Sequence, residues 1–181
     1  MQDIEFFWRQ AVTFHGHACP GLAAGCRIAF DALVLMGLEG RPTEDGYLCV
    51  AETDACSLDA VQAVWGCTMG RGNLILKPRG KQAFTFCRRG EAEGVRYCWS
   101  VPRPLPKAQS DHEKIEWYLR GPADALYATK VVPVPPLPEA RAIPSLTCTA
   151  CGERTAESMV RLLEGRPYCL DCFQDPSRFL P

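Results

Sequence analysis

Four cysteines near the end of the chain constrain its fold more than any other feature. They form two pairs, Cys148-x2-Cys151 and Cys169-x2-Cys172, with seventeen residues between the pairs. A two-residue gap lets both sulfurs of a pair reach one tetrahedral ion at about 2.3 Å, and two such pairs complete the coordination shell. Few large apolar residues surround them, so the metal must supply much of the folding energy. We therefore predict a structural zinc finger over residues 147–181.

The competing interpretation of these cysteines is that they form disulfides or remain free thiols. The chain begins with an acidic segment that lacks the basic start and cleavage site of a signal peptide. It also has no run of 18 or more apolar residues, so no membrane-spanning helix is expected. We expect a cytoplasmic protein, whose eleven cysteines serve as reduced thiols, metal ligands or catalytic groups more often than as disulfides.

Charge argues against a nucleic-acid partner. The chain carries a formal net charge of −1, and residues 146–181 hold four arginines against five acidic residues. Four thiolates around one dication would make this segment more negative still. Modules that bind nucleic acids carry a basic footprint, because phosphate neutralisation supplies most of their affinity. A regulator that binds nucleic acid through the finger is therefore disfavoured.

The first 134 residues show alternating helical and extended patterns. The patterns predict helices over residues 2–13, 20–36, 57–65 and 111–120, and extended segments over 47–53, 74–77, 83–88, 95–101 and 125–134. We predict an α+β fold, with mixed helices packed on a sheet that is mostly antiparallel. The domains are then an α+β core over 1–134, a proline-rich linker over 135–146, and the finger over 147–181.

The side-chain pattern predicts a register for the hairpin of residues 83–88 and 95–101. Pairing Cys87 with Cys98 places Phe86 opposite Trp99 and Phe84 opposite Val101, which gathers the large apolar groups on one face. The two thiols would then be the first pair in the chain to cross-link under mild oxidation.

A second group of metal-ligand residues lies near the beginning of the chain. His15, His17 and Cys19 alternate in an extended segment, and Cys19 directly precedes the helix that Pro20 begins. Cys56 occupies a similar place before the next short helix, in which Asp59 follows. A thiol at a helix N-terminus is favoured as the thiolate. We predict an open site for a second transition metal, zinc by ligand chemistry, against the alternative that these are ordinary packing residues.

A glycine-rich segment over residues 66–73 supports two interpretations equally. It lacks the lysine–hydroxyl ending of a P-loop and follows a helix, where a dinucleotide fingerprint would follow a strand. Its backbone could hold an anionic cofactor, with Gly70, Arg71, Gly72 and Lys81 as weak candidates. A helix C-cap followed by a turn explains the same glycines.

The motifs FHGHACPGLAAGCRIA (14–29), CSLDAVQ (56–62) and GCTMGRGN (66–73) resemble the family named for the E subunit of formylmethanofuran dehydrogenase. The resemblance implies an α+β core, often dimeric, and in some members a C-terminal treble-clef zinc finger; a zinc ribbon is the other form open to the four cysteines. It also implies a core metal site of His17, Cys19 and Cys56, with His15, Asp59 and Cys67 in a second tier. Cys19, Cys56 and Asp59 are the catalytic candidates.

These observations predict a metal-binding protein that acts on or handles a small molecule or cofactor linked to one-carbon or formyl oxidoreductase metabolism. The alternative is a non-enzymatic accessory subunit that handles metal or cofactor for a larger molybdenum or tungsten oxidoreductase. The expected partners are a second copy of the chain, and either a small-molecule substrate or such an oxidoreductase. The sequence leaves open whether the protein is an enzyme.

Overall fold

The computed structural model describes residues 3–42, 46–99, 110–134 and 143–175. The chain divides into two compact units, Met1–Pro136 and Leu137–Pro181. We call the second unit the finger. Most of the predicted linker, residues 135–142, lies outside the described residues. Among the described residues, no helix combines the length and apolarity needed to cross a membrane.

The first unit is built on a five-stranded sheet of order β2-β1-β3-β4-β5, in which β1 and β2 are parallel and the other neighbours antiparallel. Its elements follow one another as α1 (Ile4–His15), α2 (Pro20–Leu35), β1 (Tyr47–Ala51), α3 (Cys56–Trp65), β2 (Leu74–Leu76), β3 (Ala83–Arg88), β4 (Glu93–Trp99), α4 (Asp111–Arg120), α5 (Ala123–Leu126) and β5 (Tyr127–Pro133). The predicted α+β class with a mostly antiparallel sheet is confirmed.

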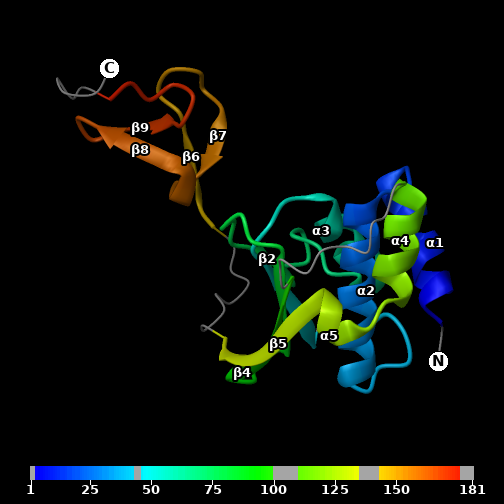
Figure 1. Cartoon of the computed structure of the whole chain (residues 1–181). Helices are drawn as coiled ribbons and strands as arrows, with labels where there is room; N and C mark the ends of the chain where they lie inside the picture. Colours follow the sequence, from blue (N-terminus) through cyan, green and yellow to red (C-terminus); the bar gives the residue numbers. More distant parts are fainter. Residues whose placement is uncertain (1–2, 43–45, 100–109, 135–142, 176–181) are drawn as a thin grey trace. The chain divides into compact units, whose positions relative to one another are not determined.

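The helices gather on one side of the sheet, and the core lies between them and that face (Figure 1). Phe84 and Phe86 project from β3 into this core, where Trp65 of α3 stacks against Phe86 with ring centroids 4.5 Å apart. The Trp65 indole N–H donates to the Ala29 carbonyl of α2 at 2.8 Å, which satisfies the one polar group that this large side chain buries. The core thus joins α2, α3 and β3.

Local sequence signals set several helix ends. Cys19 is the N-cap of α2, as predicted, and its sulfur accepts the backbone N–H of Leu22 at 3.4 Å. A capping box formed by Ser110 and Glu113 opens α4, which was predicted over residues 111–120. Cys56 is the first residue inside α3, whose N-cap is Ala55, so the expected place of Cys56 just before the helix is off by one residue. The short helix α5 was not predicted.

The predicted pairing of Cys87 with Cys98 is wrong. The structure pairs Cys98 with Ala83 and Phe84 with Tyr97, a shift of four residues from the predicted register. An even shift leaves each side chain on its own face of the sheet, so the apolar pattern alone could not distinguish the two registers. Because the two thiols do not face each other, the expected cross-link has no structural basis.

The turn of the hairpin explains the observed register. Strand β3 ends at Arg88 and β4 begins at Glu93, and the short loop between them contains Gly90 with a φ of 91°. Glycine takes this left-handed conformation without steric cost, which favours a tight connection here. Val101, which the predicted register used, lies outside the described residues.

Gly25 lets α2 approach α3 closely. A β-carbon placed on Gly25 would lie 2.6 Å from the Ser57 Cα and closer still to its carbonyl oxygen. These are backbone atoms near the start of α3, so they cannot move aside as a flexible side chain could. Gly25 is therefore required by the distance between the two helices.

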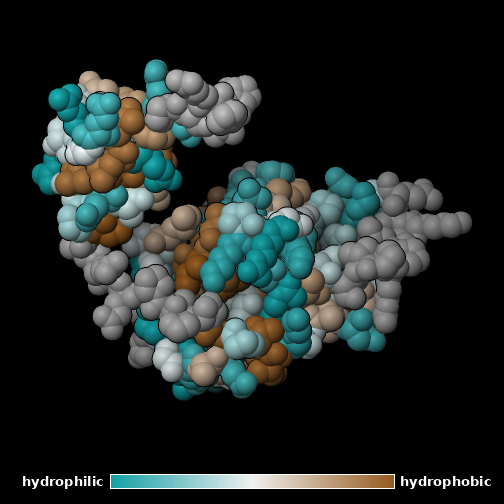
Figure 2. Space-filling model, turned by 90° about the vertical axis from the view of Figure 1, so that its left-hand side faces the viewer, coloured by the Kyte–Doolittle hydropathy of each residue, from teal (hydrophilic) through white to brown (hydrophobic). Residues whose placement is uncertain are grey.

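The finger contains two β-hairpins. They are formed by β6 (Ser145–Thr147) with β7 (Arg154–Ala156), and by β8 (Val160–Leu163) with β9 (Arg166–Cys169), with the 3-10 turn η1 (Glu157–Met159) between them. Its surface carries hydrophobic side chains, shown in brown in Figure 2. The large apolar residues that expose more than half of their surface include Ile143, Met159, Leu162 and Leu170. A unit that exposes these residues has little apolar core of its own. The treble-clef form stays a prediction.

We expect Gly25→Ala to destabilise the first unit by about 1–3 kcal/mol, because the added methyl group overlaps the Ser57 backbone. Denaturant unfolding of the full chain measures this change. Gly70→Ala is the matched control, since a β-carbon at Gly70 meets nothing within 4 Å. Equal stability of the two variants would contradict the proposed close packing of α2 on α3.

Candidate metal centres

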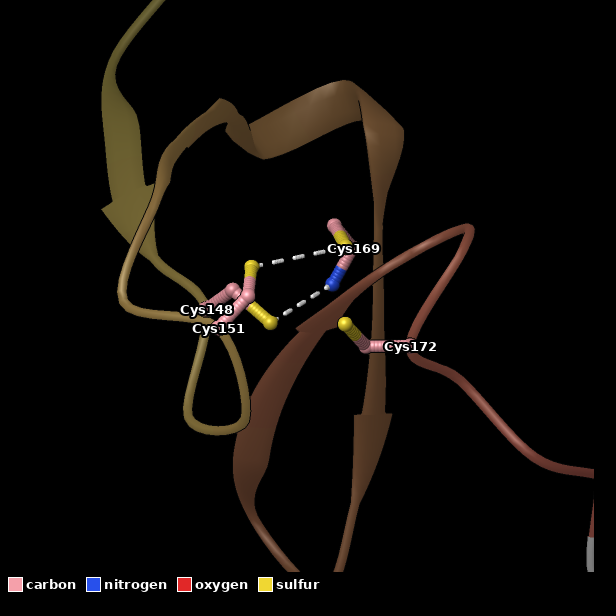
Figure 3. A group of neighbouring side chains, drawn as sticks. All are labelled: Cys148, Cys151, Cys169 and Cys172. Atoms are coloured by element: carbon pink, nitrogen blue, oxygen red, sulfur yellow. Dashed lines mark hydrogen bonds between the residues drawn. The ribbon is translucent and has the colours of Figure 1, made fainter.

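The four cysteines of the finger converge on one point. Cys148 and Cys151 lie in the loop between β6 and β7, and Cys169 ends β9 (Figure 3). Their sulfurs and that of Cys172 all lie within 4.8 Å of one another. The sulfurs of Cys151 and Cys169 are 4.0 Å apart. This separation is close to the edge of a sulfur tetrahedron around an ion at about 2.3 Å, so the residues fit the predicted group.

Backbone donors surround this sulfur cluster. The N–H groups of Cys151 and Cys169 lower the pKa of the Cys148 thiol to about 6. In contrast, hydrogen bonds with the neighbouring thiols, Cys169 first and then Cys151, raise the pKa of Cys172 to about 12. A bound dication would favour the thiolate form of all four ligands. With four protein ligands the shell is closed, so the site is structural in type.

A second cluster lies where α1 ends and α2 begins. The ligand atoms of His15, His17 and Cys19 lie within 4.8 Å of one another. His15 Nε2 is 3.9 Å from the sulfur of Cys19, and the two imidazole rings stand with centroids 4.5 Å apart. The turn between the helices explains this proximity. Gly16 closes α1 in a left-handed conformation with a φ of 91°, which turns the chain back toward Cys19.

Asp59 contacts the edge of the His15 ring that faces away from Cys19. His15 Nδ1 lies 2.7 Å from an Asp59 carboxylate oxygen, and the second oxygen accepts from the Gln62 side chain at 3.4 Å. A carboxylate can only accept, so Nδ1 carries a proton, and Nε2 is the ring nitrogen on the side of Cys19 that can bind a metal. Metal-binding histidines are commonly oriented in this way by a carboxylate on the far nitrogen. The geometry places Asp59 behind His15, away from the ligand atoms.

Cys56 lies beside Cys19. A β-carbon on Gly21, two residues after Cys19, would contact the Cys56 Cβ at 3.5 Å. Burial first, and then the neighbouring Cys19 thiol, raise the pKa of Cys56. The beginnings of α2 and α3 therefore bring the two thiols together, as the sequence indicated. The tight group of ligand atoms contains His15 in place of Cys56, although His15 was expected only in the second tier.

Cys67 does not join this cluster, contrary to the expectation. It follows the C-terminal end of α3, whereas Cys56 begins that helix, and ten residues of helix span about 15 Å. Burial raises the pKa of Cys67 to about 12, which keeps it a neutral thiol. Cys26 and Cys49 are also fully buried and act as small apolar residues.

The glycine-rich segment forms a turn that uses its own hydrogen-bond donors. Gly66 is the left-handed C-cap of α3. The backbone N–H of Thr68 donates to the Asn73 side chain at 2.8 Å, and that of Gly72 to the Met69 carbonyl at 3.0 Å. These donors are not available to an anion. These bonds favour the C-cap and turn interpretation of the segment, while Lys81 lies on a different loop.

A small cavity borders the second cluster. Its volume is about 220 Å³, and its lining includes Pro20 and Ser57, the residues that follow Cys19 and Cys56. Trp99 and Tyr118 form one wall, with ring centroids 4.9 Å apart in an edge-to-face pair. Gln82, whose side chain accepts from the Ser57 hydroxyl at 2.6 Å, supplies a polar group. The volume is below the roughly 300–1,000 Å³ of typical ligand pockets, so it suits a small group or one end of a larger molecule.

Comparison with solved structures shows a shared fold. The crystal structure of a tungsten formylmethanofuran dehydrogenase FmdE-like protein from Syntrophus aciditrophicus superposes with a TM-score of 0.69. The match covers 93% of this chain and 90% of that chain, at 24% sequence identity.

One curated relative matches part of the chain. A protein of Archaeoglobus fulgidus described as a "Probable S-adenosyl-L-methionine-binding protein" is 38% identical over 90 residues. The match spans 48% of this chain and 25% of that protein, so the chain corresponds to about a quarter of its relative.

Family comparison identifies both units. Residues 143–178 match the prokaryotic dksA/traR C4-type zinc finger, which agrees with the convergence of the four cysteines. Residues 14–130, well over half of the chain, match the family described as "FmdE, Molybdenum formylmethanofuran dehydrogenase operon". This match includes the second cluster and the whole sheet except the end of β5. The chain belongs to the FmdE family and carries a C4-type zinc finger.

Proposed function

We propose that this protein binds two metal ions of different roles and uses the first unit to bind or transform a small molecule linked to one-carbon or formyl oxidoreductase metabolism. The ion of the finger is zinc, held by Cys148, Cys151, Cys169 and Cys172, and it stabilises the fold. The ion of the first unit is a transition metal, zinc by its mixed nitrogen and sulfur ligands. His15, His17 and Cys19 would hold it, with Cys56 at the edge of the shell.

The observation that carries the proposal is the hydrogen bond between His15 and Asp59 behind the ligand cluster. Packing alone does not require a carboxylate that turns the free imidazole nitrogen toward a thiol and a second imidazole. The cluster also lies on a partly exposed surface, with His17 open to solvent and Cys19 half-buried. Three protein ligands and an accessible position are typical of reactive metal sites, whereas structural sites are closed.

Each part of the first unit would then have a separate task. A bound metal would act as a Lewis acid toward an oxygen or sulfur of the ligand. Asp59 fixes the tautomer and orientation of His15. The Leu22 N–H donates to the Cys19 sulfur and fixes its position at the start of α2. The cavity beside Ser57 and Trp99 would hold the organic part of the ligand and exclude water from it.

An accessory role is the second candidate, and the description of the family by its dehydrogenase operon favours it. In that role the first unit would bind its ligand stoichiometrically and pass it to a larger oxidoreductase. Rapid mixing with candidate formyl and one-carbon compounds separates the two roles, because only an enzyme releases product through many cycles.

Metal content tests the two sites independently. We expect the full chain to hold about two zinc equivalents, and Cys151→Ser/Cys172→Ser and His15→Ala/Cys19→Ser to hold about one each, as measured by elemental analysis after dialysis. His112→Ala/Cys98→Ser removes the same residue types outside both clusters and should keep both ions. Retention of both ions by His15→Ala/Cys19→Ser would contradict the proposed site in the first unit.

Removal of the carboxylate behind His15 tests the positioning role of Asp59. We expect Asp59→Ala to weaken metal binding in the first unit by about 10- to 100-fold, because His15 loses its fixed orientation. Competition with a chromogenic chelator measures the affinity in the Cys151→Ser/Cys172→Ser background. Asp54→Ala removes a nearby exposed carboxylate and should change little. If both variants weaken binding equally, Asp59 acts only through net charge.

A further inference from the structure

A basic pocket lies on the sheet face opposite the helices, and it belongs to neither metal cluster. Four residues of neighbouring strands stand in one row across this face: Val50 pairs with Thr85, Thr85 with Arg96, and Arg96 with Lys130. The row therefore crosses β1, β3, β4 and β5 and ends in two cationic side chains.

A buried ion pair forms the base of the pocket. Arg96 donates from Nε and Nη2 to the two carboxylate oxygens of Glu52, at 2.6 and 3.0 Å. The Glu52 side chain is only 7% exposed and that of Arg96 14%. The Arg96 hydrogen bonds, together with the charges of Arg96, Arg79 and Lys81, hold the pKa of Glu52 below its usual value. The pair is fixed in position by its two parallel hydrogen bonds.

The loop from β2 to β3 brings three more cations to the rim. Backbone N–H groups of Lys77 and Arg79 donate to the carbonyls of Ala51 and Glu52, at 2.8 and 2.9 Å. These bonds fasten the loop around the end of β1, so the cationic side chains of Lys77, Arg79 and Lys81 surround Glu52.

The resulting pocket has a volume of about 390 Å³ and an excess of positive charge. It is lined by five cationic side chains and by one carboxylate. That carboxylate belongs to Glu52, which already forms an ion pair with Arg96. Within the described parts of the chain, no ion pair involves the side chains of Lys77, Arg79, Lys81 or Lys130. Cations gathered in a concave site repel one another and attract an anion. Val50, Val132 and Val134 add apolar surface to the lining.

We propose that this pocket binds a small molecule that carries a phosphoryl or diphosphoryl group. Arginine and lysine together suit such a group, since the guanidinium presents a fixed fork of donors and the ammonium a compact charge. The apolar lining suits an organic portion attached to the phosphate. The pocket is confined, and the chain as a whole has a net charge of −1. A compact anion therefore fits it better than a nucleic acid, which requires an extended basic surface.

The basic pocket and the second cluster are joined by a short segment of chain. Glu52 is four residues before Cys56, and four residues of chain span at most about 14 Å. Lys81 lines the basic pocket while the next residue, Gln82, lines the cavity beside Cys19 and Cys56. The anion site does not require the metal site, and it can be tested without metal.

Calorimetric titration of the full chain with pyrophosphate tests the proposal. We expect saturable binding at one site per chain and a loss of affinity of at least about tenfold in Arg79→Gln/Lys81→Gln, since two exposed cationic contacts are removed. Arg9→Gln/Lys114→Gln removes the same charge elsewhere on the first unit and should change the affinity less than about twofold. Circular dichroism of each variant verifies the fold.

Three results would overturn the proposal. The first is the absence of saturable binding at millimolar pyrophosphate. The second is equal weakening in the two double variants, which would show a general charge effect. The third is tighter binding of citrate or of a 20-nucleotide single strand than of pyrophosphate, which would assign the pocket to carboxylates or to nucleic acid.

Discussion

The close approach of α2 to α3 is the constraint on which the rest of the first unit depends. Gly25 permits it, because any larger residue would overlap the Ser57 backbone. The approach places the first turns of both helices side by side, so that Cys19 and Cys56 become neighbours. The same contact brings Asp59 within hydrogen-bonding distance of His15 at the end of α1. One glycine thus connects the packing of two helices with the geometry of the ligand cluster.

The structural features that depend on local chemistry could be predicted from the sequence. The CxxC spacing indicated the finger, and the proline after Cys19 indicated the start of α2. Each signal acts over only a few residues, where backbone geometry leaves few alternatives. The features that depend on distant residues were harder. The hairpin register was wrong because an even shift preserves the faces of both strands, and only the turn at Gly90 distinguishes the two.

The same contrast between local and distant determinants applies to the candidate sites. His15 was ranked below His17 because the sequence does not show that Asp59, 44 positions later, supports its ring. Cys67 was placed in the second tier by the family resemblance, although a helix separates it from Cys56. The basic pocket was missed, apart from Lys81, because its cations come from several strands and one loop. A signal was present in the cations at 77, 79 and 81, which end one predicted strand and lie in the loop before the next.

The central claim is that the first unit holds a metal through mixed nitrogen and sulfur ligands, separate from the four sulfurs of the finger. X-ray absorption at the zinc edge, recorded on the full chain with Cys151→Ser/Cys172→Ser, tests it most directly. The account predicts a zinc shell with two imidazole nitrogens at about 2.0–2.1 Å and one or two sulfurs at about 2.3 Å. A shell of four sulfurs, or a folded protein that binds no zinc, would contradict it.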